Sequence, residues 1–301
     1  MRKGQKGKSV MSNSSSASFI AFTASISNTS SNKTRIAKQF SRAANTYNSA
    51  ADVQLDIAFD ALDFVQGHYK IGLDVGCGTG RISQQLAARC DKVVAMDIAF
   101  GMLAYAEQDY HASDDSICWV QGDADCLPMA DHSVDMVFSS MALQWSDNQQ
   151  KVMSEIARVM ACDSNALLAI MCEGSFSQLN DSWQNIDSQR HVNNFASAQT
   201  WYDAAKSQGL QVSMQEKRYV TWHKDVRHLL SSIKSIGANV LLTNQDSTEQ
   251  PKCENKNAFN RHTLQHLETF YQQKYAKNMQ LPLTYQVCFL NCSKSSSKSH
   301  S

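Results

Sequence analysis

The sequence predicts a doubly wound α/β fold with a seven-stranded, mostly parallel sheet and a helical cap added on one side. Short apolar runs alternate with segments of helical periodicity through the middle of the chain, which is typical of parallel strands joined by crossover helices. A glycine-rich turn at residues 74–80 follows the first strand and precedes a helix. Beyond Met171 polar helical segments become frequent, which favours a cap.

The alternating segments define the expected elements in chain order. Strands are expected in short apolar or alternating runs, and helices where apolar residues recur every three or four positions. The strands are 71–75, 92–97, 117–121, 134–138, 165–171, 211–223 and 283–290. The helices are 81–89, 101–110, 149–160, 226–236 and 261–274, with helix and loop over 176–206 and a polar, turn-like stretch at 241–260.

Composition changes at about residue 33. Residues 1–33 are rich in Ser, Asn and Lys and contain no acid, which favours a disordered N-terminal extension over a targeting peptide. Residues 34–301 are expected to form a single domain, with the cap built from 34–55, 176–206 and 225–280. No apolar run approaches the ~18 residues of a membrane span, so no membrane partner is expected.

The charge balance and the cysteines exclude several classes. The 28 basic and 28 acidic side chains give a net charge of +0, so no global field attracts nucleic acid. Nine cysteines without any C-x-x-C pair argue against a disulfide framework and predict reduced thiols in a cytoplasmic protein without a bound metal. Six of them lie in or beside apolar runs and are expected to pack as small hydrophobes: Cys77, Cys90, Cys118, Cys126, Cys162 and Cys172.

The glycine turn predicts a ligand other than a dinucleotide. Gly76, Gly78 and Gly80 follow a G-x-G-x-G spacing, whereas a pyrophosphate is seated by G-x-G-x-x-G. Asp74, just before the turn, would repel a phosphate, but it suits a ligand that carries an ammonium and a sulfonium. A nicotinamide-dependent oxidoreductase is therefore disfavoured.

Two further acids follow the next two strands. Asp97 ends the second strand roughly 20 residues after the first glycine, where a carboxylate can accept from ribose hydroxyls. Asp123 follows the third strand, where it could accept from an adenine amino group. Ligands bind at this edge of such sheets, although each acid alone could equally be a solvated turn aspartate.

This arrangement resembles the class I S-adenosylmethionine-dependent methyltransferases, whose fold is Rossmann-like. The resemblance implies S-adenosylmethionine as the cofactor. It assigns the methionine part to Asp74 and the turn, the ribose to Asp97, and the adenine to Asp123, with Ile98 and Ala124 beside the ring. The turn residues are Gly76, Cys77, Gly78 and Gly80. Leu143, Gln144 and Trp145 would lie near the departing methyl group, although Trp145 could equally be a buried anchor.

Several stretches are similar to one branch of that family, the malonyl-acyl-carrier-protein O-methyltransferases of biotin synthesis. These stretches are 40–47 with Ala50, Ala51 and Gln54, then 127–128, 140–145, 173–176, 183–187 with His191, Asn193 and Phe195, 229–237 and 281–285. The resemblance implies O-methylation of the free malonyl carboxyl, which gives the methyl ester that primes pimeloyl synthesis. That branch often has Arg where this chain has Asn194, and Arg190 could substitute.

The implied chemistry needs substrate positioning and no general base, because a carboxylate with a pKa around 4 is already ionised near neutral pH. Arg190 or His191, with Tyr47 and Tyr285, could hold the carboxyl group, beside Gln144 and Trp145. A surface role for His191 and helix packing for Tyr47 are the plainer alternatives.

The implied partner is malonyl-acyl-carrier protein, a small acidic protein. Arg35, Lys38 and Arg42 recur at helical spacing, and Arg227 and Lys234 stand two turns apart on another helix; both sets could form a basic face or simply be solvated. Two other functions stay open. The chain could methylate another small molecule, or it could be a non-catalytic cofactor-binding module that docks on a carrier protein.

Overall fold

The computed structural model describes residues 31–110, 116–239, 241 and 261–295, and within them it contains one seven-stranded sheet. The strand order is β3-β2-β1-β4-β5-β7-β6. The first five strands pair in parallel, and β7 runs antiparallel to both β5 and β6. The strands are β1 Tyr69–Val75, β2 Cys90–Asp97, β3 Ile117–Gln121, β4 Val134–Ser140, β5 Met160–Met171, β6 Gln211–His223 and β7 Leu281–Lys294. The predicted fold class is confirmed.

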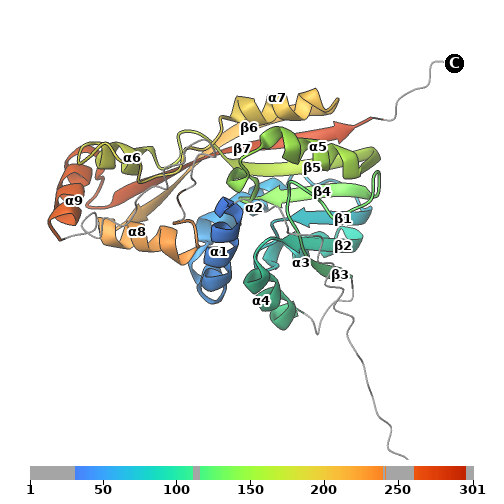
Figure 1. Cartoon of the computed structure of the whole chain (residues 1–301), viewed down its shortest axis with the longest axis horizontal. Coiled ribbons are helices and arrows are strands. Elements are labelled where there is room, and N and C mark those ends of the chain that lie inside the picture. The colour runs from blue at the N-terminus through green and yellow to red at the C-terminus, as the bar shows by residue number, and fades with distance from the viewer. Residues whose placement is uncertain (1–30, 111–115, 240, 242–260, 296–301) are drawn as a thin grey trace, which may run out of the picture.

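Helices cover the sheet and build the cap (Figure 1). They are α1 Ser31–Ala50, α2 Asp52–Leu62, α3 Arg81–Ala87, α4 Phe100–Tyr110, α5 Gln149–Val159, α6 Ser177–Gln184, α7 Ala198–Ser207, α8 Val226–Ser235 and α9 Arg261–Tyr275, with a short 3₁₀ turn η1 at Leu143–Trp145. Three of them begin at a side-chain cap: Asn148, Ser197 and Asp225 accept from backbone N–H groups in the first turns of α5, α7 and α8. None of the described helices is long and apolar enough to cross a bilayer.

The core is divided between the two faces of the sheet. On one face, side chains of α2, α6, α8 and α9 pack together with the strands, and Trp183 and Tyr271 are fully buried there. On the other face α5 and α7 cover the sheet, with Trp201 fully buried beneath them. Burial on both faces accounts for the near-continuous apolar runs of β4 and β5.

The β6–β7 pair carries the cap. It runs from Gln211↔Ser293 to His223↔Leu281, whereas β5 pairs with β7 only as far as Met171↔Val287. The free end of the pair extends past the sheet, where α6, α8 and α9 gather around it and α1 lies alongside (Figure 1). Tyr271 anchors α9 to this end, because its buried hydroxyl donates to the Pro282 carbonyl at 2.6 Å.

Several boundaries and one burial prediction differ from the sequence expectation. Helix α1 begins at Ser31, so residues 31–33 are helical, while residues 1–30 of the expected extension lie outside the described residues, as do 242–260 of the expected turn-like stretch. Strand β5 begins at Met160 rather than at 165, with Asp163 at a positive φ of 58°. Cys118, Cys126 and Cys162 are exposed rather than packed, because their strand and loop positions face solvent.

Candidate active site

The glycine loop between β1 and α3 is shaped by three residues in the left-handed region. Gly76, Gly78 and Gly80 have φ values of 78°, 55° and 79°, which favour glycine. A Cβ on Gly76 would lie 2.1 Å from Cβ of Ala142, and one on Gly80 would lie 2.4 Å from the Trp119 ring. A Cβ on Gly78 would meet nothing within 4 Å. Gly76 and Gly80 therefore serve close packing, and the space where Gly78 would carry a side chain is open to a ligand.

Asp97 ties this loop to the end of β2. Its Oδ2 accepts from the Gly78 N–H at 2.9 Å, and its Oδ1 accepts from the Ala99 N–H at 2.7 Å. Burial raises the pKa of the Asp97 carboxyl, although these backbone N–H groups act to lower it. A carboxylate held so firmly presents its remaining lone pairs in a fixed direction to neighbouring hydroxyl groups.

Asp74, just before the loop, is a buried acid. Its side chain is 2% exposed, and the Ser83 hydroxyl donates to its Oδ2 at 2.7 Å. Burial raises the pKa of Asp74 to about 7; the Ser83 hydrogen bond lowers it, and nearby Asp97 raises it. A buried carboxyl that ionises reluctantly gains most from a cationic ligand, which suits an ammonium group.

The cofactor cleft runs along the carboxyl ends of β1, β2, β3 and β4. Its larger part, about 780 Å³ counted to its open mouth, reaches Ile98 and Ala124, and its smaller part, about 490 Å³, reaches Asp74 and Cys77. Both parts are lined by Tyr47, Gly76, Gly78 and Ser140. The cleft therefore accommodates an elongated ligand with an apolar ring at one end and a charged group at the other.

The far end of the larger part holds an ion pair that the sequence did not indicate. Nζ of Lys33 lies 2.6 Å from Oδ1 of Asp123 and 2.5 Å from Oδ2 of Asp125, and the Lys33 side chain is 9% exposed. Lys33 was not predicted, because it belongs to residues 1–33, whose polar composition predicted disorder. The helical spacing of Lys33, Ile36 and Phe40, which all line this cleft, was the available signal.

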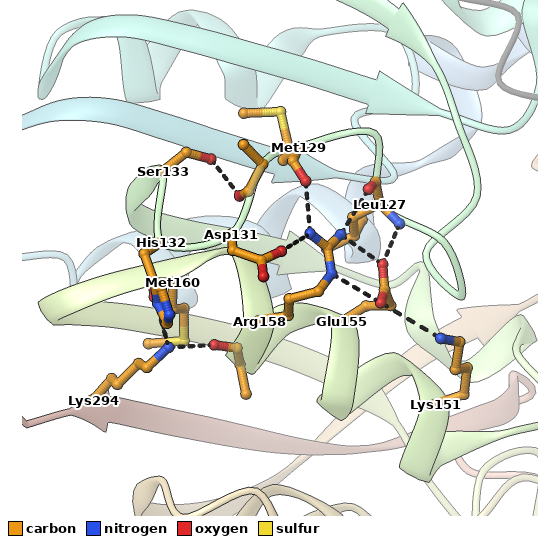
Figure 2. Close-up of polar contacts among 12 residues, drawn as sticks. Leu127, Met129, Asp131, His132, Ser133, Lys151, Glu155, Arg158, Met160 and Lys294 are labelled. Atoms are coloured by element: carbon orange, nitrogen blue, oxygen red, sulfur yellow. Dashed lines mark hydrogen bonds and ion pairs between the residues drawn. The ribbon is translucent and has the colours of Figure 1, made fainter.

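The loop that follows Asp123 is braced from α5 (Figure 2). Arg158 donates to the carbonyls of Leu127 and Met129 at 2.9 and 2.8 Å and to Asp131 at 2.7 Å. Glu155, itself paired with Arg158 at 2.8 Å, accepts from the Leu127 N–H at 2.9 Å. Glu155 thus binds a backbone N–H of the loop, and Arg158 binds two of its carbonyls. Both side chains stabilise the loop that follows Asp123.

The cleft fits a nucleoside that carries a sulfonium and an amino acid. Buried Asp74 and half-buried Asp97 both line the cleft beside Gly78, and the Ser140 hydroxyl is buried without a hydrogen-bond partner among the described residues. Arg81 also lines the smaller part, where it could meet a carboxylate, and it was not predicted. The absence of a phosphate-seating loop agrees with a nucleoside rather than a dinucleotide.

Comparison with known proteins assigns the family. Residues 73–167 match the family described as Methyltransferase domain. The chain is 36% identical over 212 residues to the Malonyl-[acyl-carrier protein] O-methyltransferase of Yersinia pestis, covering 69% of this chain and 76% of that protein. This chain belongs to the malonyl-[acyl-carrier protein] O-methyltransferase family. As a class I methyltransferase, it is an enzyme whose cofactor is S-adenosylmethionine.

Two further comparisons describe the breadth of this likeness. The Biotin biosynthesis bifunctional protein BioHC of Cellvibrio japonicus is 32% identical over 265 residues, which cover 87% of this chain. The chain spans 50% of the length of that bifunctional relative. Among solved structures, the YcgJ protein of Bacillus subtilis superposes with a TM-score of 0.56 at 15% identity, covering 80% of this chain and 98% of that one, which supports the fold.

The predicted cofactor residues of this methyltransferase are largely brought together. Asp74, Cys77 and the other cleft residues surround one space, and Gly80 instead packs against Trp119 outside it. The predicted residues that line the cleft are Asp74, Gly76, Cys77, Gly78, Asp97, Ile98, Asp123 and Ala124. Burial raises the pKa of the Cys77 thiol well above its usual range, so it stays protonated and acts as a packing group.

A second space, the acceptor chamber, adjoins the cleft. It measures about 290 Å³ counted to its open mouth and shares Phe40, Tyr47, Met141 and Trp145 with the cleft. Its remaining lining residues are Gln54, Gln144, Met171, Phe176, Ile236, Ala238 and Tyr285. Oε1 of Gln54 and Oε1 of Gln144 are buried without a hydrogen-bond partner among the described residues, so polar groups in this apolar chamber remain available to a ligand.

The structure does not bring Arg190 and His191 to the acceptor chamber. His191 stacks on Trp183 with ring centroids 4.0 Å apart, and its Nε2 lies 2.9 Å from Oδ1 of Asp187. Neither Arg190 nor His191 lines the cleft or the chamber. The stacking and the Asp187 contact hold His191 beside α6.

Proposed function

We propose that this chain transfers a methyl group from S-adenosylmethionine to the free carboxyl of malonyl-acyl-carrier protein, giving the methyl ester that primes pimeloyl synthesis for biotin. The observation that carries the proposal is the acceptor chamber, which opens beside Tyr47 at the point where both parts of the cofactor cleft meet. Kinship with the Yersinia pestis enzyme supplies the substrate class.

The lining of the chamber suits a carboxylate nucleophile. Among the described residues that line it, none is cationic, so the acceptor oxygen keeps its electron density. Burial, followed by Asp97, raises the pKa of Tyr47 to about 12, and burial also raises the pKa of Tyr285. Both residues are therefore phenols at neutral pH, and each has a hydroxyl that can donate to the acceptor carboxylate.

The bound cofactor supplies a methyl group made electrophilic by its sulfonium. Transfer to a carboxylate cancels one positive and one negative charge, so no proton has to move and no general base is required. The protein's contribution is to orient the acceptor and to exclude water from it, which strengthens a weak nucleophile. Trp145 serves this purpose, because its ring packs edge-on against Phe40 and Phe195 at the chamber wall.

The carrier protein is part of the same proposal, as is a cytoplasmic location, which the free thiols of the described cysteines support. Arg35, Lys38 and Arg42 are exposed on α1, and Arg227 and Lys234 are exposed on α8. Such faces suit an acidic partner and raise its association rate. Reversal of Arg35, Lys38 and Arg42 to Glu should raise KM for the carrier-bound substrate; an unchanged KM would reject this surface.

Mass spectrometry of malonyl-carrier protein incubated with enzyme and cofactor tests the reaction. The expected result is a gain of one methyl group that an esterase removes. Free malonyl-coenzyme A and small phenols serve as competing acceptors in parallel. Methylation of a phenol with no reaction on the malonyl carrier would reject the proposed acceptor, and cofactor binding without turnover on any acyl acceptor would indicate a non-catalytic module.

A further inference from the structure

A third space adjoins the acceptor chamber. This outer cleft of about 840 Å³ is bounded by the end of α1, the start of α2, the end of β6 and helix α8. It shares Ile236 and Tyr285 with the acceptor chamber, whereas the chamber shares Tyr47 and Trp145 with the cofactor cleft. The outer cleft therefore adjoins the chamber at Tyr285, and the chamber adjoins the cofactor cleft at Tyr47.

Apart from the carboxylate of Asp52, the lining of the outer cleft is rich in uncharged hydrogen-bonding groups. Hydroxyls and imidazoles dominate it: Ser49, Thr221, His223, His228, Ser231, Ser232 and Ser235. Burial lowers the pKa of His223 to about 4, so its ring is neutral, and its two nitrogens lie 3.2 Å from Nδ1 of His228 and 2.8 Å from Oγ1 of Thr221. Such a surface suits an elongated, neutral ligand with amide and hydroxyl groups.

Positive charge stands at the outer end of this cleft. Lys38, Arg42 and Thr46 follow one another at intervals of four along α1, so they share a face that leads to Ser49. Arg42 precedes Ser49 by two turns, about 10 Å at 1.5 Å per residue. The Thr46 hydroxyl donates to the Ser235 carbonyl at 3.2 Å, which joins this face to α8 beside exposed Lys234.

We propose that the outer cleft receives the 4′-phosphopantetheine arm of the acyl carrier. The amides and hydroxyl of the arm occupy the serine- and histidine-lined part, and its phosphate lies toward Arg42 and Lys234. The thioester passes Tyr285, so the malonyl carboxyl enters the acceptor chamber. This inference rests on the proposed function, and it adds a binding site for the arm that is distinct from the cofactor and acceptor sites.

A bulky side chain in the cleft tests the path. Ser231 is exposed and lines the cleft, so Ser231→Trp should fill part of it without disturbing the core. Ser213→Trp, at an exposed position near the far end of β6, is the matched control. Two acceptors are compared: malonyl-carrier protein, which has the arm, and monoethyl malonate, which has the same carboxyl and no arm. Calorimetric affinity for S-adenosylmethionine reports that each variant is folded.

We expect Ser231→Trp to lose activity with the malonyl carrier and to keep it with monoethyl malonate. Ser231→Trp should lower kcat/KM for the malonyl carrier about tenfold or more, because the indole occupies space assigned to the arm, and it should leave monoethyl malonate kinetics and cofactor affinity unchanged. An equal loss with both acceptors, or carrier kinetics equal to those of Ser213→Trp, would overturn the inference. Failure of the unmodified enzyme to methylate the malonyl carrier would instead reject the proposed function.

Discussion

The cofactor cleft and the acceptor chamber differ in how much of the chain is needed to build them. Most of the cleft comes from strand ends and their following loops between Val75 and Ser146, with Lys33 and neighbouring α1 residues as the remote contribution. The chamber takes Tyr47 from α1, Gln54 from α2, Trp145 from η1 and Tyr285 from the last strand. A local motif thus specifies the first site, and the global topology specifies the second.

The two sites also differ in charge. The cleft is lined by four acids, Asp74, Asp97, Asp123 and Asp125, and the chamber contains neutral amides and phenols among its described lining residues. A cationic cofactor and an anionic acceptor are thereby received in separate environments. Substitutions in the cleft should therefore change cofactor affinity, and substitutions in the chamber should change acceptor turnover.

The largest effect is expected at Asp97. Asp97→Ala removes the acceptor of the Gly78 and Ala99 N–H groups and the proposed ribose ligand, so cofactor affinity should fall roughly 100-fold in calorimetry, as loss of charged hydrogen bonds predicts. Asp91→Ala is the control, because Asp91 is exposed at the other end of β2 and contacts His68. Equal affinities for the two variants would contradict the assignment of the cleft.

Acidification should weaken cofactor binding through Asp74. Since the pKa of Asp74 is raised to about 7, the carboxyl is protonated below that pH in the free protein, and binding an ammonium must expel this proton. The calorimetric Kd should therefore rise by up to about tenfold for each pH unit below 7 and level off above it. Asp74→Asn should abolish this slope; a slope that persists in the variant would assign the titration to another group.

Tyr285 should affect the acceptor side alone. Tyr285→Phe removes a hydroxyl from the chamber, so kcat/KM for the malonyl carrier should fall about tenfold while cofactor affinity stays constant. Tyr275→Phe provides the control, because its hydroxyl donates to Asp181 outside the chamber at 2.6 Å. A matching loss of cofactor affinity in Tyr285→Phe would show that the two sites are not separate.

The smallest effect is expected at Lys33. Lys33→Met leaves Asp123 and Asp125 without the ammonium that lies within 2.7 Å of each, so they should repel one another and weaken cofactor binding about fivefold. Lys38→Met changes an exposed lysine of the same helix and should leave the affinity unaltered. Tighter binding in Lys33→Met would mean that the lysine competes with the cofactor for Asp123.

Sequence reasoning reached the sheet and most of the cleft because both depend on local signals. The strand preceding Gly76 and the acids at strand ends are adjacent in the chain to the loops they shape. Lys33 was hidden by the polar composition around it, and Arg81 by its ordinary place at a helix start. Four residues of the chamber were predicted, Tyr47, Gln144, Trp145 and Tyr285. Gln54 was not, because its place there depends on how far the β6–β7 pair carries Tyr285.

The strand order implies that the two sites form at different times during synthesis. Strands β1 to β5 pair with one another without β7, whereas β6 pairs only with β7 among the described strands. On the ribosome, the nucleoside-binding half can therefore assemble early, and the edge ribbon must wait until residues near Lys294 emerge. During synthesis the strands that carry the cofactor cleft are thus complete before β7 supplies Tyr285 to the acceptor chamber.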